Sequence, residues 1–124
     1  MLETNADLAK AIRAGIPLSP IHEQGGLYLN RFHDIDGQVV FCACALGTAA
    51  LAELGTDSFP NLINVSGKID EWWCRQPIAR FHVSNPHSKA NPESLFDVII
   101  TLNDVYNWSR EHICDWLESL EQPS

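Results

Sequence analysis

The segment over residues 42–54 constrains the fold more than any other part of the chain. It reads Cys-Ala-Cys-Ala-Leu-Gly-Thr-Ala-Ala-Leu-Ala-Glu-Leu and runs into Gly55. Its one charged residue is Glu53, and most of its side chains are small. A helix that is apolar on nearly every side belongs in a protein interior. The segment therefore predicts a central helix that the rest of the chain encloses.

The composition indicates a folded globular protein with a single domain over residues 1–124. Hydrophobic residues make up 45% of the chain and charged residues 19%, which disfavours disorder. Sixteen acidic and eight basic residues give a net charge of −8, and the basic residues are scattered. This balance disfavours binding to nucleic acid or to an anionic membrane. No run approaches the roughly 20 apolar residues that a membrane span needs.

The first residues, Met-Leu-Glu-Thr-Asn-Ala-Asp, lack the basic start and apolar core of a signal peptide. We therefore expect a cytoplasmic protein, in which the four cysteines remain reduced thiols.

Before the central segment, the pattern predicts a helix and a short hairpin. A helix is expected over residues 5–14, with Thr4 or Asn5 as its cap and Gly15 at its end. Residues 27–32 partly alternate, residues 34–37 suit a turn, and residues 38–41 suit a returning strand. The alternative is that residues 39–41 form the first turn of the central helix.

Residues 56–92 have the least regular pattern. Residues 68–74 suggest a short helix, and residues 79–83 suggest a short strand. A connection of this length is either a binding loop or a set of small elements.

The last third predicts two consecutive amphipathic helices, which form an αα-hairpin. Asn91 is the expected N-cap of the first, with Pro92 at its first position. The second is expected to start at Ser109, with Trp108 and Ile113 as a hydrophobic staple. The apolar stripe of the first helix consists of Leu95, Val98, Ile99, Leu102, Val105 and Tyr106.

These patterns together predict an α+β protein that is mainly α. Its central small-residue helix is packed by the N-terminal helix and the C-terminal αα-hairpin. A short β-hairpin or small sheet from residues 27–41 and 79–83 covers one side.

Cys42 and Cys44 are the first candidates for a chemical site. In a helix their side chains point about 200° apart and cannot share one metal, whereas in a strand they share a face. The remaining cysteines and histidines show no C-x-x-C or H-x-x-x-H pairing. We therefore expect no metal and no cofactor, and we interpret the thiols as buried packing residues.

A cysteine-dependent hydrolase or transferase is the alternative interpretation. A thiol at a helix N-terminus has its thiolate stabilised, and a histidine can act as its base. In this reading Cys44 or Cys42 is the nucleophile, His82 is the base, and Asn103 or Asp104 orients the base.

Asn103 falls on the apolar side of its predicted helix, where an amide needs hydrogen-bond partners. It either satisfies backbone groups at a loop or helix end, or it contacts a ligand.

Trp72 and Trp73 cannot both face the same way on a helix or strand. We expect at least one of them to fill the core, and we treat the pair as a candidate partner-binding surface because the other can be partly exposed.

Two short motifs carry a family resemblance. Residues 44–49 read Cys-Ala-Leu-Gly-Thr-Ala, and Leu102-Asn103-Asp104 precedes the last amphipathic helix. They resemble a family of small uncharacterised bacterial and phage proteins with a C-A-L-G-A-type helix and a later W/L-N-D motif. Thr48 stands where that family favours alanine. The resemblance implies an architecture but no reaction, and it suggests that Cys44 and Asn103-Asp104 meet in space.

The leading functional prediction is a non-catalytic binding or interaction module with an unknown protein or small-molecule partner. An exposed face on the last helix is compatible with a homodimer, but a monomer's core has equal need of Trp116 and Leu120.

Overall fold

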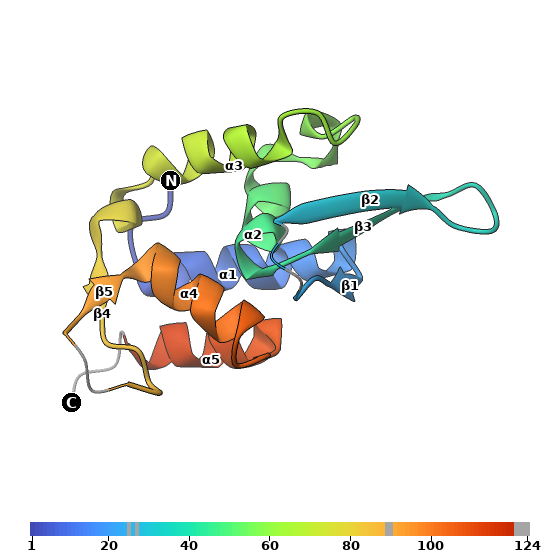
Figure 1. The fold of residues 1–124 in the computed structure, drawn as a ribbon. Helices are drawn as coiled ribbons and strands as arrows, with labels where there is room; N and C mark the ends of the chain where they lie inside the picture. Colours follow the sequence, from blue (N-terminus) through green and yellow to red (C-terminus); the bar gives the residue numbers. More distant parts are fainter. Residues whose placement is uncertain (25, 27, 89–90, 121–124) are drawn as a thin grey trace.

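The chain forms an α+β fold dominated by helices, as the sequence predicts (Figure 1). The computed structural model describes residues 1–24, 26, 28–88 and 91–120. The α-helices in this part of the chain are α1 (Asn5–Gly15), α2 (Ala45–Leu54), α3 (Val65–Cys74), α4 (Leu95–Asp104) and α5 (Arg110–Ser119). Short 3-10 helices cover Ile16–Leu18, Thr56–Ser58 and Pro77–Arg80. None of the described helices is long and apolar enough to cross a membrane.

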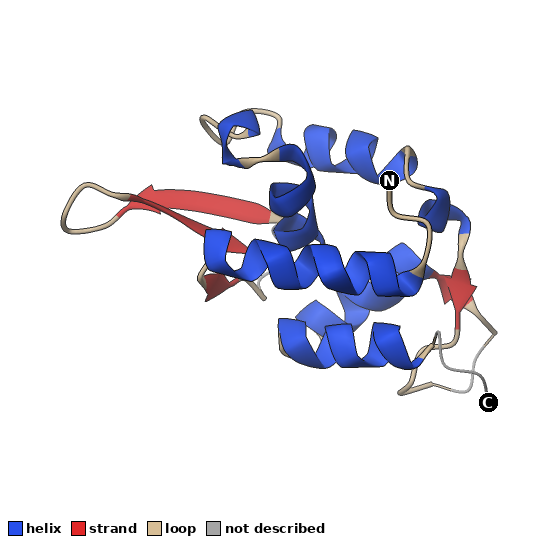
Figure 2. Cartoon of the chain, turned by 180° about the vertical axis from the view of Figure 1, so that it is seen from behind, coloured by secondary structure: helices blue, strands red, loops and turns tan. Residues whose placement is uncertain are grey.

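Two small sheets complete the fold of the described residues. In the first, β3 (Val39–Ala43) lies between β1 (Ile21–His22), which is parallel to it, and β2 (Leu29–His33), which is antiparallel. In the second, β4 (His82–Val83) pairs with β5 (Glu93–Ser94). The β2–β3 hairpin projects away from the helices (Figures 1 and 2). Leu27, where the predicted first strand begins, lies outside the described residues.

Helix α2 is the buried centre of the fold, but it is shorter than the sequence predicts. Residues 45–51 are all buried, whereas Glu53 and Leu54 are exposed. Cys42 and Ala43 belong to β3, and Cys44 is the N-cap of α2 in an extended conformation. The prediction of one helix over residues 42–54 was therefore wrong at its start. The β-branched and aromatic residues just before it favour a strand that pairs with β2.

Two glycines let backbones approach α2 closely. A Cβ on Gly15 would lie 2.0 Å from the carbonyl oxygen of Thr48, where α1 meets α2. A Cβ on Gly47 would lie 1.8 Å from the carbonyl oxygen of Tyr28. Neither distance is compatible with a side chain, so both approaches depend on glycine.

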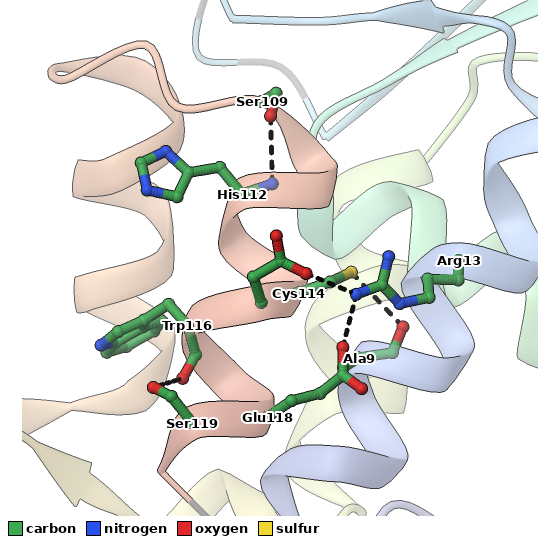
Figure 3. A network of polar contacts seen from close by, with 9 residues as sticks. Ala9, Arg13, Ser109, His112, Cys114, Trp116, Glu118 and Ser119 are labelled. Carbon is green, nitrogen blue, oxygen red and sulfur yellow. Dashed lines mark hydrogen bonds and ion pairs between the residues drawn. The ribbon is translucent and has the colours of Figure 1, made fainter.

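The helices at the two ends of the chain pack against each other (Figure 3). Arg13 on α1 forms ion pairs with Asp115, at 2.8 Å, and with Glu118 on α5. The Cys114 thiol donates to the carbonyl oxygen of Ala9 at 3.4 Å. The predicted helix starts are confirmed here: Thr4 and Asp7 form a capping box on α1, and Ser109 caps α5.

The middle of the chain resolves into small elements. Helix α3 begins at Val65, three residues before the predicted helix. Of the strand predicted over residues 79–83, His82 and Val83 form β4, whereas Ala79 and Arg80 end the 3-10 helix Pro77–Arg80. Helix α4 is capped by Ser94 and not by Asn91, because the residues just before it pair with β4. Val105 and Tyr106 follow the end of α4 and are exposed, so they do not extend its apolar stripe.

Candidate functional site

Asn103, in the last turn of α4, joins three parts of the fold. Its side chain is 1% exposed. Its Oδ1 accepts from the backbone N–H of Ala45 at 3.1 Å and from Nε2 of His22 at 2.6 Å. Its Nδ2 donates to the carbonyl oxygen of Glu23 at 3.0 Å and to Oδ1 of Asp104 at 2.7 Å. The amide thus satisfies a helix-end donor and a loop acceptor, which is the structural role predicted for it.

A cavity of about 100 Å³ lies beside this amide, between the start of α2 and the end of α4. Its apolar wall includes Leu46, Ile99 and Ile100. Cys44, Asn103 and Asp104 all line it, so the two sequence motifs do meet in space. Among the described residues, Gly26, Tyr28 and Ala45 also line it.

The Cys44 thiol has a structural role at the start of α2. Its Sγ accepts from the backbone N–H of Gly47 at 3.4 Å and so caps α2. Burial raises the pKa of the thiol to about 11, although the N–H groups at the helix start partly oppose this shift. The thiol is therefore protonated near neutral pH, and a protonated thiol is a poor nucleophile.

The candidate base predicted from sequence is not at this site. His82 is exposed on β4, and its Nδ1 lies 3.2 Å from the carbonyl oxygen of Arg80. The histidine beside Asn103 is His22, on β1. Burial lowers the pKa of His22, and the hydrogen bond to Asn103 partly opposes that shift. His22 could not be singled out from the sequence, because its strand β1 has two residues and shows no periodicity.

Cys42 and Cys44 do not form a shared site. Cys42 lies in β3, opposite Ile21 of β1 and Asn30 of β2, and does not line the cavity. Burial raises the pKa of Cys42, and the charge of Arg110 partly opposes this. Within the described residues, no group of three or more histidine, cysteine or acidic side chains is placed to hold a metal ion.

The predicted partner surface at Trp72 and Trp73 is wrong, because both side chains are buried, with exposed fractions of 6% and 5%. Trp73 packs against Phe96 with ring centroids 5.7 Å apart. The N–H of Leu2 donates to Oε1 of Gln76 at 2.9 Å and holds the start of the chain against the residues that follow α3. Leu2 and the two tryptophans belong to one buried hydrophobic cluster.

A buried arginine, Arg110, is linked to Cys44 through hydrogen bonds to Thr48. Arg110 is 5% exposed, and its Nη1 donates to the carbonyl oxygen of Ser19 at 2.7 Å, to Ser19 Oγ and to Thr48 Oγ1. The Thr48 hydroxyl donates in turn to the carbonyl oxygen of Cys44 at 2.7 Å. Sequence reasoning missed this residue, since an arginine at the start of a helix is ordinarily solvated.

Comparison of the chain with protein-family models, curated proteins and solved structures found no match.

Proposed function

We propose that the chain is a non-catalytic binding module of the cytoplasm, and that the cavity between α2 and α4 is its ligand site. The observation that carries this proposal is the state of the thiol in the cavity wall. Cys44 is used as a helix cap, is buried, and has a pKa raised to about 11. A cavity whose thiol is bound in this way is better suited to holding a ligand than to attacking one with that thiol.

The walls of the cavity support a binding role. Leu46 is on α2, and Ile99 and Ile100 are on α4, so helices rather than loops shape the apolar part. Ligand sites generally combine such an apolar wall with a few fixed polar groups. Here the polar groups are Asn103 and Asp104, and Asn103 is held in place by four hydrogen bonds.

A thiol-dependent hydrolase or transferase is the second candidate. It is favoured by the 2.6 Å hydrogen bond between His22 and Asn103, because an amide that orients a histidine is a common partner of a catalytic cysteine. In this version His22 takes the role assigned from sequence to His82, and Cys44 remains the nucleophile.

Alkylation by iodoacetamide separates the two candidates. In the native protein near neutral pH, we expect the exposed Cys74 to react and the buried Cys44 to react only after unfolding. A Cys74→Ser variant removes the background, and Cys44→Ala in that variant identifies the signal of Cys44. Rapid alkylation of Cys44 in folded Cys74→Ser protein would favour the enzyme instead.

A small neutral probe tests the cavity directly. We expect n-butanol to shift the backbone amide resonances of Leu46, Ile99 and Ile100 in a ¹H–¹⁵N spectrum. A probe that shifts none of them at millimolar concentration would contradict a ligand site at this position.

A further inference from the structure

Asp104 is a carboxylate at the cavity without a cationic partner. It is half-buried and is the one acidic side chain among the described residues that line the cavity. Its hydrogen bond comes from the neutral amide of Asn103, at 2.7 Å. Within the described part of the chain, no lysine, arginine or histidine nitrogen lies within 4.0 Å of it. No cation of the described residues therefore pairs with this carboxylate, and a cationic ligand in the cavity could do so.

The positive groups near Asp104 are already engaged or neutral. His22 lies on the other side of Asn103, and its burial lowers its pKa, so it is mostly neutral near pH 7. Arg110 donates to Ser19 and Thr48. The N–H groups of Ala45 and Gly47 at the positive end of α2 bond to Asn103 and Cys44. None of them neutralises the carboxylate.

The cavity next to this carboxylate is apolar and small. Leu46, Ile99 and Ile100 belong to the apolar part of its wall, and its volume of about 100 Å³ suits a chain of a few carbon atoms. The protein as a whole carries a net charge of −8, which attracts cations and repels anions.

We propose that the cavity binds a primary alkylammonium ion, with the ammonium on the Asp104 carboxylate and the alkyl chain against Leu46, Ile99 and Ile100. This inference rests on the proposed function and names its ligand class. An ammonium group offers three donors and a full charge, and charge-assisted hydrogen bonds are about twice as strong as neutral ones. A free alkylamine and a lysine side chain share this chemistry.

The test compares two probes of equal length on the full chain. n-Butylammonium chloride and n-butanol are titrated near neutral pH at the same ionic strength, and the amide resonances of Leu46, Ile99 and Ile100 are followed. We expect n-butylammonium to bind roughly tenfold more tightly than n-butanol, because the two differ in the charged group. Raising the salt concentration should weaken the binding of n-butylammonium and leave that of n-butanol unchanged.

Asp104→Asn identifies the carboxylate. The variant keeps an oxygen that can accept from Asn103, and we expect it to lose roughly tenfold in n-butylammonium affinity. Its affinity for n-butanol should stay the same, which shows that the cavity is intact. Asp36→Asn, at the exposed tip of the β2–β3 hairpin, makes the same change in net charge and should leave both affinities unchanged.

The outcomes separate this inference from the proposed function. Equal binding of both probes, or an Asp104→Asn variant that binds n-butylammonium normally, overturns the ammonium site but leaves a binding module. Failure of both probes overturns the binding module as well. A lysine capped at both ends distinguishes the sources: Asp104-dependent binding of it supports a lysine side chain as the ligand, and binding of n-butylammonium alone supports a free amine.

Discussion

The side-chain amide of Asn103 holds together segments that are far apart in the sequence. The residues it bonds include His22 and Ala45, which lie 81 and 58 positions away. Asn103→Ala would leave the buried Ala45 N–H without its acceptor and would remove the hydrogen bond to His22. Each buried group left unpaired costs about 1–3 kcal/mol. We expect a loss of about 3 kcal/mol in the free energy of unfolding, measured by urea denaturation.

Asn61→Ala is the matched control for this loss. Asn61 is exposed, and its Oδ1 accepts from the backbone N–H of Ile63 at 2.8 Å. Its replacement should cost less than about 1 kcal/mol, because water can replace the lost bond. If the two variants lost the same stability, Asn103 would not be the joint that the structure indicates.

His22 makes stability depend on pH in a defined direction. Its pKa in the folded protein lies below the unfolded value of 6.5, mainly because of burial. Between these two values the unfolded chain binds more protons, so stability falls as pH drops below about 6.5. Above that pH the effect is absent. We expect His22→Gln to reduce the difference in unfolding free energy between about pH 7.5 and about pH 5, measured in urea.

His33→Gln is the comparison, since it removes an exposed histidine from β2. It should leave the pH dependence of the wild-type protein largely intact. A His22→Gln variant with an unchanged pH dependence would show that His22 does not contribute to it.

For single residues, the sequence predicted the role of a side chain better than the residues that it contacts. The helical wheel indicated that the Asn103 amide needs hydrogen bonds, and the structure confirms them. The apolar residues around Cys44 in the sequence indicated a packing residue, and Cys44 is buried. His22 escaped prediction because its bond to Asn103 depends on tertiary structure. The exposure of Trp72 and Trp73 was misjudged for the same reason, since their burial depends on tertiary packing such as that of Trp73 against Phe96.

The contact between α1 and α2 depends on the absence of a side chain at Gly15. A Cβ there would meet the backbone oxygen of Thr48 at 2.0 Å, and a backbone in the core cannot easily move away. Gly15→Ala should therefore force the two helices apart. We expect it to destabilise the protein by about 3 kcal/mol in thermal or urea unfolding.

Gly67→Ala makes the same chemical change in α3, but we do not expect it to lower the stability of the protein. A Cβ at Gly67 would meet the Asn64 side-chain oxygen at 2.4 Å, and that flexible side chain can turn away. Because alanine is the better helix former by about 1 kcal/mol, this variant should be neutral or more stable. A large loss at Gly67, or none at Gly15, would contradict the helix–helix contact as the cause.

Elements with strong local signals were predicted well, and those that depend on pairing were not. The cap at Thr4 and the start of α5 at Ser109 follow from local residue chemistry. The cap of α4 was misplaced at Asn91 because the pairing of Glu93 with Val83 extends the backbone up to Ser94. A two-residue strand leaves no period in the sequence to detect.

At the scale of the molecule, α2 lies among the other elements while the β2–β3 hairpin extends beyond them (Figure 2). The centre of the fold was predictable because a segment of small apolar residues has no stable place except the interior. The projection of the β2–β3 hairpin away from the core was not predictable. Its strands carry apolar residues such as Phe32 and Val39, which suggest burial but are partly exposed in the structure.

This arrangement predicts unequal local stability, which hydrogen exchange measures. The amides of Ala49, Ala50 and Leu51 in α2 are enclosed by the core and should exchange only when the whole chain unfolds. The outer half of the hairpin, around the fully exposed Ile35, has few buried neighbours and should exchange through local opening at a much lower free energy. Rapid exchange in α2 of the folded protein, or equal protection of the hairpin and α2, would be incompatible with α2 as the buried centre that positions Cys44 and its cavity.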